Sequence, residues 1–484
     1  MTSKEELQSR INQWIEDHKE QMIQDAIELV QIKSVSQKNE GGFPYGTGCA
    51  KALDTALKMA QRMGFETENQ DYYSGTAYLK GKTKKQLGVF GHLDIVPEGD
   101  LANWDFAPYD AVYKNGYILG RGSSDNKCPA VASLYALKCI KDLEIPMEHT
   151  VMMYFGCDEE AGMSDIVHFL ENRKAPEFSF TSDGRYSLCC GEKGILTAKL
   201  TTDLSGSNLV GIWGGQASNM VPDYAKAVIR GVDAEELSGK FPELKVTEQE
   251  DKTVLAEATG IAAHAAFPEG SESALRKLAS MLAAADILDE KGQRAAAFLS
   301  EGFQDYYGTG LHIDFEDEIV GKTTAVGGAA YVEDGKLTQL LNVRYALRAD
   351  QEEMIENLKR TCGEYGFEVE NLKNDPPMYM DLENPCVQIL HETANEFLDG
   401  TYTPYVMGGG TYARKIPNAV AYGPTTRKID ATNPLVYGEG HQPNEGMKLT
   451  DMTTGIRIYV NALIRLDELL KIKRSKEEAP KEGM

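Results

Sequence analysis

The stretch LGVFGHLDIVP, residues 87–97, places a short apolar run directly before a histidine and an aspartate. The run Leu87–Phe90 predicts a buried strand, because such runs bounded by glycine are typical of sheet interiors. Two further apolar runs, Val151–Phe155 and Phe178–Thr181, predict strands of the same kind. Helical patterns at 130–143 and 164–172 separate them, and this alternation indicates an α/β sheet.

Each predicted strand ends in a polar loop. His92 and Asp94 follow the first strand, Glu159 and Glu160 follow the second, and Asp183 follows the third. A fourth loop, GSSDNK at 122–127, carries Asp125 and leads into the helix that Pro129 begins. Ligands gather outside the carboxyl ends of the strands in such sheets. One acidic loop is usually solvated surface, but four loops at one edge predict a site.

These side chains suit metal chemistry. Oxygen and imidazole ligands without thiolates favour Zn²⁺, Mn²⁺ or Co²⁺, and a bridging carboxylate allows two ions to share one water. Adjacent glutamates point in different directions, so Glu160 can bind metal while Glu159 acts as a general base. In an extended segment His92 and Asp94 lie on one side, where the carboxylate can fix the tautomer of the ring.

The pattern changes after about residue 193. Strands are expected at 195–200, 225–230 and 340–347, together with an alanine-rich helix at 272–288, and helices resume at 387–398 and 451–470. The sequence therefore predicts a first catalytic part at 1–193, an inserted domain at 194–384, a second catalytic part at 385–472 and a flexible tail at 473–484.

Composition excludes several functions. The chain has 484 residues with 74 acidic and 50 basic side chains, a formal charge of −24, which argues against nucleic-acid binding. No apolar run reaches the ~18–20 residues of a membrane helix. Eight cysteines without CxxC spacing indicate reduced thiols. We therefore expect a cytoplasmic protein with no nucleic-acid or membrane partner.

Several motifs carry a resemblance to a known family. GHLDIVP at 91–97, GRGSSDNK at 120–127 and DEE at 158–160 resemble the dinuclear-zinc metallopeptidases that include glutamate carboxypeptidase, aminoacylase and carnosinase. The motifs GGQASNMVP at 214–222, GGTYAR at 409–414 and HQPNE at 441–445 agree. The chain is most similar to the peptidase V and Sapep type of bacterial dipeptidase, from about residue 10 to residue 470.

The resemblance implies a fold and a set of metal ligands. The expected fold is the mixed-sheet α/β catalytic domain of the phosphorylase/hydrolase-like zinc peptidases, with an inserted α+β lid. Two divalent ions, Zn or Mn with Co as a further option, would be bound. One ion would be held by His92 and Asp183, the other by Glu160 and His441, and Asp125 would bridge them.

It also implies the catalytic groups. Asp94 would orient His92, and Glu159 would take a proton from the metal-held water and pass it to the leaving amine. His264 of the lid would stabilise the oxyanion, and Asn219 and Arg344 would hold the carboxylate end of the substrate. The backbone at Gly409, Gly410 and Thr411 would approach the substrate closely. The long lid favours a monomer in which His264 serves its own chain.

Four positions depart from the family pattern, one of them Gly184, which follows Asp183 where alanine is common. Cys128 replaces a glycine, and Ala262 and Ala265 replace the serine and glycine that flank the lid's Ala-His pair. Cys128 beside the site suggests sensitivity to oxidation. The family also holds the peptide bond after the bridging aspartate, here Asp125-Asn126, in the cis form.

The predicted activity is the hydrolysis of dipeptides. An amidohydrolase of N-acyl amino acids, acting as a deacylase or desuccinylase, is the alternative enzyme, and a non-catalytic metal-binding or peptide-binding relative is the alternative outside catalysis. The remaining histidines of interest belong to no set of converging acidic loops, so structural or surface roles are expected for His18, His149, His168, His312 and His391.

Overall fold

The computed structural model describes residues 4–426 and 437–477 and divides the chain into two compact units. The base unit comprises the chain up to Cys190, Met380–Tyr405 and the residues from Gly410 onward. The insert unit comprises Gly191–Tyr379 and Val406–Gly409. The domain limits given above stay a prediction, and residues 478–484 of the predicted tail lie outside the described residues.

A mixed sheet forms the centre of the base unit. Its order includes the run β1-β2-β6-β3-β7-β22, in which β3 lies parallel to β6 and β7, β22 lies parallel to β7, and β2 lies antiparallel to β6. The strands are β1 (Glu66–Gln70), β2 (Ser74–Leu79), β3 (Gln86–His92), β6 (Thr150–Gly156), β7 (Phe178–Thr181) and β22 (Ala419–Ala421). The three strands predicted before the polar loops and the predicted mixed α/β fold are confirmed.

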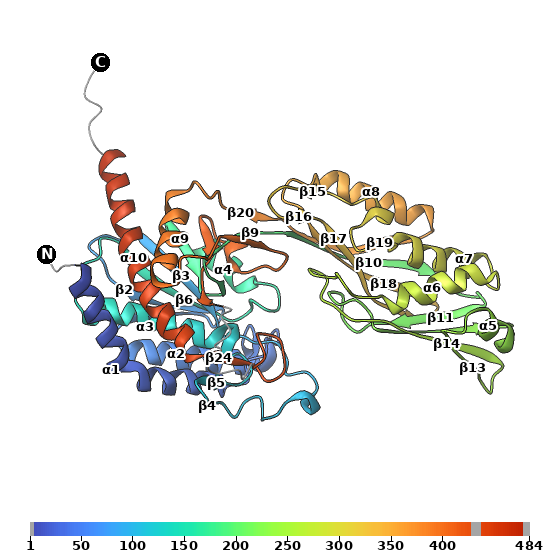
Figure 1. The fold of residues 1–484 in the computed structure, drawn as a ribbon, viewed down its shortest axis with the longest axis horizontal. Helices are drawn as coiled ribbons and strands as arrows, with labels where there is room; N and C mark the ends of the chain where they lie inside the picture. The colour runs from blue at the N-terminus through green and yellow to red at the C-terminus, as the bar shows by residue number, and fades with distance from the viewer. Residues whose placement is uncertain (1–3, 427–436, 478–484) are drawn as a thin grey trace, which may run out of the picture. The chain divides into compact units, whose positions relative to one another are not determined.

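Helices cover this sheet. They are α1 (Lys4–Val30), α2 (Gly46–Arg62), α3 (Cys128–Asp142), α4 (Ser164–Asn172), α9 (Pro385–Phe397) and α10 (Leu449–Glu477). Pro129 lies in the first turn of α3, where its missing N–H costs no helical hydrogen bond. α3 is buried along most of its length and contacts both α1 and α10 (Figure 1).

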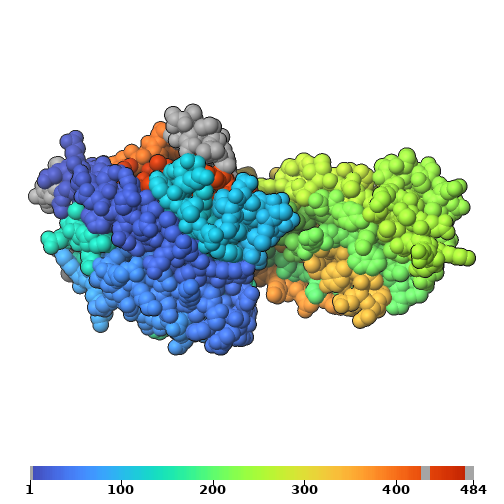
Figure 2. Space-filling view, turned by 90° about the horizontal axis from the view of Figure 1, so that it is seen from below, coloured from blue at the N-terminus to red at the C-terminus, as the bar shows by residue number. Residues whose placement is uncertain are grey.

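A small antiparallel sheet lies beside α1. It consists of β4 (Val112–Lys114), β5 (Tyr117–Leu119) and β24 (Gly446–Lys448), with β5 in the middle. β4 and β5 contact α1, and Figure 2 shows this part of the surface, dark blue beside light blue. β24 therefore connects the segment before α10 to the residues just before the Asp125 loop.

The insert unit is built on an antiparallel sheet with the order β13-β14-β12-β11-β17-β18-β10-β19. The strands are β10 (Gly194–Asp203), β11 (Leu209–Gly214), β12 (Tyr224–Arg230), β13 (Lys245–Glu248), β14 (Thr253–Thr259), β17 (Thr324–Glu333), β18 (Lys336–Tyr345) and β19 (Glu368–Asp375). Helices α6 (Ala274–Ala285), α7 (Glu290–Ala297) and α8 (Gln351–Glu364) cover one face (Figure 1). The predicted inserted α+β fold is confirmed.

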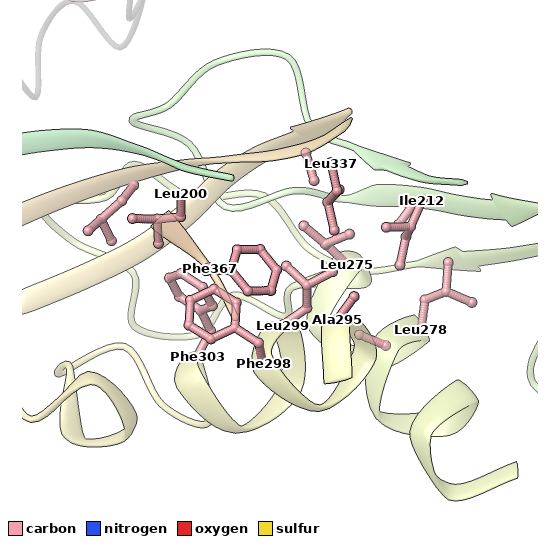
Figure 3. Packing of buried hydrophobic residues seen from close by; sticks show 14 of the residues in the cluster. Leu200, Ile212, Leu275, Leu278, Ala295, Phe298, Leu299, Phe303, Leu337 and Phe367 are labelled. Atoms are coloured by element: carbon pink, nitrogen blue, oxygen red, sulfur yellow. The ribbon is translucent and has the colours of Figure 1, made fainter. Parts of the chain in front are cut away.

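Apolar packing holds these helices on the sheet. Phe298, Phe303 and Phe367 fill the space under the strands that carry Leu200 and Leu337 (Figure 3). The rings of Phe298 and Phe367 stack with their centroids 4.1 Å apart. This arrangement gives the insert unit a core of its own, as an independent domain requires.

The alanine-rich helix is shorter than predicted. α6 begins after Ser273, whose hydroxyl accepts a hydrogen bond from the amide of Arg276, and it ends where Asp286 adopts a left-handed conformation. A serine cap and a left-handed residue are ordinary helix boundaries, and they override the apolar spacing that predicted 272–288.

Two compositional features can be described in the structure. All eight cysteines are free and buried. Within residues 4–426 and 437–477, no helix combines the length and apolar character needed to cross a membrane.

Candidate metal centre

His92 lies at the carboxyl end of β3 with its ring fully buried. Its Nδ1 is 3.0 Å from the backbone carbonyl oxygen of Asp94 and 3.5 Å from that residue's carboxylate. An Nδ1–H donated to the carbonyl leaves Nε2 as the lone-pair nitrogen, which lies 3.0 Å from Oδ1 of Asp125. Asp94 therefore lies where it can orient the ring, through its backbone as well as its side chain.

Asp125 lies between two imidazoles. Its Oδ1 faces His92, and its Oδ2 is 3.3 Å from Nε2 of His441. His441 in turn lies 3.0 Å from Oε1 of Glu160. Gly440 permits this approach, because a Cβ there would lie 2.8 Å from Oδ2 of Asp125. The carboxylate thus offers one oxygen to each side, which is the arrangement that a bridging ligand needs.

Glu159 and Asp183 complete the cluster. Oδ2 of Asp183 is 3.7 Å from Nε2 of His92. Oε1 of Glu159 is buried and has no hydrogen-bond partner among the described residues. Potential ligand atoms come within 4.8 Å of one another in two groups, His92 with Asp125 and Glu160, and His92 with Glu159 and Asp183.

Buried carboxylates hold the backbone of the glutamate loop. Asp94 accepts hydrogen bonds from the amides of Glu159 and Glu160, at 3.1 and 3.0 Å. Asp165 accepts from the amides of Cys157 and Asp158 and from the hydroxyl of Tyr412. Asp94 thus positions both glutamates in addition to His92.

The electrostatics are those of an excess of negative charge. Burial raises the pKa of Glu159 well above its usual value, and burial together with neighbouring Asp125 raises the pKa of Asp183 to about 8. Hydrogen bonds to Asp125 and Glu160 raise the pKa of His441 to about 11. Each shift shows that the site favours added positive charge, as a proton or as a metal ion.

The residues fit divalent ions. Five segments of the base unit supply five carboxylates and two imidazoles: His92 with Asp94, Asp125, Glu159 with Glu160, Asp183, and His441. Oxygen and nitrogen donors in this mixture suit Zn²⁺, Mn²⁺ and Co²⁺. The unpartnered oxygen of Glu159 and the two-sided placement of Asp125 agree with a paired-ion site.

The predicted lid residues lie in the insert unit. Asn219 and His264 belong to two paired segments, joined by a bridge between Met220 and His264 and by the amide of Ala265 donating to the Asn219 carbonyl. Nδ1 of His264 accepts from the amide of Ala266 at 3.1 Å, so the proton of the neutral ring lies on Nε2. Nε2 lies 3.5 Å from the side-chain amide of Asn219, and an Nε2–H would donate to the oxygen of that amide, since the amide nitrogen can only donate.

Arg344 is held in a fixed orientation. Its Nε donates to Asn342 at 2.9 Å and its Nη1 donates to the carbonyl of Gly408 at 3.0 Å, both within the insert unit. Of the predicted glycine loop, Gly409 belongs to the insert unit, whereas Gly410 and Thr411 belong to the base unit. Thr411 caps the short helix η6 (Tyr412–Arg414), which carries Tyr412 to Asp165.

Two of the departures from the family pattern, Ala265 and Cys128, fit their surroundings. Ala265 is fully buried in a small apolar cluster with Val221 and Val326, so its methyl group fills space. Cys128 is fully buried at the start of α3, and burial raises its pKa, which disfavours the reactive thiolate. The suggested oxidation sensitivity of Cys128 therefore has no support from its surroundings. The Asp125-Asn126 peptide bond is cis, as expected.

Sequence reasoning missed three supporting residues. Asp165 and Tyr412 hold the glutamate loop, and Glu445 accepts hydrogen bonds from the backbone of the Asp125 loop. Tyr412 and Glu445 stand inside quoted motifs, but a motif does not indicate which distant loop a side chain will reach. Nothing in the sequence indicates that the carboxylates of Asp165 and Glu445 are buried, and their burial is what marks them as partners of these loops.

The chain is similar to known proteins along most of its length. Residues 88–465 match the model of a family described as "Peptidase family M20/M25/M40". The chain is 31% identical over 465 residues to "Putative dipeptidase YtjP" of Bacillus subtilis (strain 168), covering 93% of this chain and 97% of that protein.

Two crystal structures are similar in fold. The M20 family metallo-carboxypeptidase Sso-CP2 from Sulfolobus solfataricus has a TM-score of 0.57 at 17% identity, with 91% of this chain and 98% of that chain covered. Human carnosine dipeptidase 1 has a TM-score of 0.55 at 15% identity, with 95% and 100% covered. At these identities the likeness concerns the fold alone.

Proposed function

The chain belongs to peptidase family M20/M25/M40, and from that premise we propose that it is a metal-dependent dipeptidase. The observation that carries the proposal is Asp125, whose two carboxylate oxygens face His92 and His441 separately within a cluster of further carboxylates. The relative named a dipeptidase supports the choice of substrate, since it aligns with nearly the whole chain.

The base unit would bind two divalent ions. His92 and Asp183 would hold one, Glu160 and His441 the other, and Asp125 both. When bound, the ions supply positive charge that polarises the scissile carbonyl and lowers the pKa of water. Zn²⁺ and Mn²⁺ suit the donors best, with Co²⁺ as a further option.

Glu159 would move the proton. Its carboxylate is buried and its backbone is held by Asp94, so its position is set before substrate arrives. The attacking water transfers a proton to Glu159 as its oxygen bonds to the carbonyl carbon. Glu159 then returns that proton to the nitrogen as the C–N bond breaks. A base held in this way is worth roughly 10²–10⁴-fold in rate.

The insert unit would bind the rest of the substrate. His264, with its proton on Nε2, would donate to the oxyanion. Asn219 and Arg344 would hold the carboxylate end, and the fixed guanidinium suits two-point recognition of a carboxylate. Gly409, Gly410 and Thr411 would offer backbone groups close to the peptide. Binding of the carboxylate end close to the reacting carbonyl would favour dipeptides over longer chains.

We expect His264 to serve the site of its own chain, so that a monomer is active. A structure that places His264 at the metals of another subunit would contradict this. We further propose a cytoplasmic location, since all eight cysteines are free.

The test is a substrate panel. Metal-free protein would be loaded with Mn²⁺, Zn²⁺ or Co²⁺ and assayed against free dipeptides, N-acetyl amino acids and N-succinyl amino acids, with Glu159→Gln as the matched variant. We expect turnover of dipeptides, lost in Glu159→Gln. Turnover of the acylated compounds alone would replace the dipeptidase with an amidohydrolase. No turnover of any compound, with metal bound, would favour a binding protein.

A further inference from the structure

Glu445 is a fully buried carboxylate with a donor on every side. Its Oε1 accepts hydrogen bonds from the amides of Ser124 and Asp125 at 2.7 and 3.0 Å. Its Oε2 accepts from the amide of Gly122 at 3.0 Å and from Nη1 of Arg121 at 2.7 Å. Three backbone amides of one loop, those of Gly122, Ser124 and Asp125, therefore converge on a single side chain that lies far away in the sequence.

The same segment carries His441, four residues earlier. Arg121 joins the two loops a second time, because its Nη1 also lies 3.2 Å from the carbonyl of Gln442. A third connection is the amide of Gly120, which donates to the carbonyl of Glu445 at 3.0 Å. Strand β5 ends just before Gly120, and strand β24 begins just after Glu445. These two strands pair, so the two loops are also joined through their adjacent strands.

This arrangement matters because its two ends reach the candidate metal centre. The side chain of His441 is 56% exposed, so packing of the ring does little to hold it, yet its Nε2 lies 3.3 Å from Oδ2 of Asp125. The hydrogen bonds of Glu445 join the backbone of the Asp125 loop to the segment that carries His441. Ligand groups must be held within about 0.5 Å of their working geometry, and surrounding hydrogen bonds supply that precision.

We propose that Glu445 is a positioning residue, which sets the separation of Asp125 and His441 and thereby the affinity of the site for divalent ions. The proposal rests on the proposed function for the identity of these two ligands. Glu445 itself contacts backbone amides and Arg121, and it acts only through the loops that it joins.

The chain offers a matched control at Asp467. Its carboxylate is also buried and also accepts from two backbone amides, those of Glu148 and His149, at 2.9 and 2.7 Å. It also contacts a basic side chain, with Oδ1 at 2.7 Å from Nδ1 of His149. Asp467 touches none of the candidate ligands, so its loss reproduces the general cost of breaking a buried carboxylate cradle.

The experiment compares Glu445→Gln with Asp467→Asn in the full chain. Mn²⁺ binding to each metal-free protein is measured by calorimetry, beside the melting temperature without metal and kcat and KM with metal. We expect Glu445→Gln to weaken Mn²⁺ binding about 10–100-fold, the usual effect of losing a group that orients ligands. kcat should fall while KM changes little. Asp467→Asn should lower the melting temperature and leave Mn²⁺ affinity unchanged.

Equal Mn²⁺ affinity in Glu445→Gln and the unmodified protein would overturn the proposal, as would an equal loss of affinity in both variants. If Glu445→Gln does not fold, Arg121→Lys takes its place, since it keeps the charge but loses the contact to Gln442, and it should weaken Mn²⁺ binding in the same direction. The proposed function fails separately, when the unmodified protein binds Mn²⁺ and hydrolyses no dipeptide.

Discussion

The two ends of the central sheet in the base unit carry similar residues with opposite outcomes. Five carboxylates, which follow β3, β6 and β7 or belong to the loop of Asp125, surround His92 and His441. At the amino end of β6, His149 lies 2.7 Å from Asp467 and 3.2 Å from Glu177, and Lys85 lies 2.7 Å from the second oxygen of Glu177. His92 and His149 are both fully buried.

The difference is one of charge balance. With His149 protonated, the amino end has two cations for two carboxylates and forms a closed ion network. The carboxyl end keeps an excess of carboxylates even when both imidazoles are charged. A histidine beside acids is therefore no sign of a metal site by itself, and the number of carboxylates left over is the better guide.

The sharpest test of the comparison is Glu159→Gln. The substitution keeps the size of the side chain and the backbone contact to Asp94 but removes the carboxylate that is proposed as the general base. We expect kcat to fall by roughly 10²–10⁴-fold, measured by steady-state hydrolysis of a dipeptide. Glu177→Gln at the other end is the control and should leave kcat unchanged. A similar loss in both variants would remove the distinction between the two ends.

His264→Ala tests whether the site at the carboxyl ends of the strands needs a group from the insert unit. Loss of the Nε2 donor should lower kcat by roughly 10²–10³-fold, the usual cost of one oxyanion donor. Metal affinity should be preserved, because His264 is not a proposed ligand. Calorimetry with Mn²⁺ provides that control, and unchanged kcat would show that the oxyanion is stabilised from elsewhere.

Divalent metal should stabilise the protein only through the candidate metal centre at the carboxyl ends of the strands. At a free Mn²⁺ or Zn²⁺ concentration of about 100 times Kd, binding adds roughly 2.7 kcal/mol to the free energy of unfolding. We expect a raised melting temperature in thermal scans, reversed by a chelator. The increment should persist in His149→Gln, and a saturating ion without any shift would contradict the site.

The smallest expected effect is the pH dependence of the closed network. Hydrogen bonding to Asp467 raises the pKa of His149 above its usual value of about 6.5. The charged ring thus adds stability that is fully present below about pH 6.5 and is lost as the pH rises through the raised pKa. Each unit of elevation is worth about 1.36 kcal/mol.

Urea unfolding of the unmodified protein and of His149→Gln, from about pH 6 toward pH 9, measures this contribution. The stability difference should shrink as the pH rises. A difference that grows with pH would mean that the neutral ring is the stabilised form.

Much of the fold was predictable because its signals are local. Strand β3 and helix α3 follow from a short apolar run and from Pro129, both of which act within a few residues. The end of α6 was missed, because a left-handed Asp286 leaves little trace in hydrophobic spacing. For His149 a structural or surface role was expected, but its partner Asp467 could not be predicted, because it lies 318 residues away along the chain.

Periodicity and residue chemistry act between neighbours along the chain, so they predict which strands form and which donor types follow them. The distant partner that each carboxylate meets depends on the tertiary structure. Asp125 lies between two histidines, Glu445 accepts hydrogen bonds from the loop of Asp125, and Asp467 pairs with His149. Burial and long-range hydrogen bonds set the charge and geometry of these groups, and they exist only once distant segments pack together.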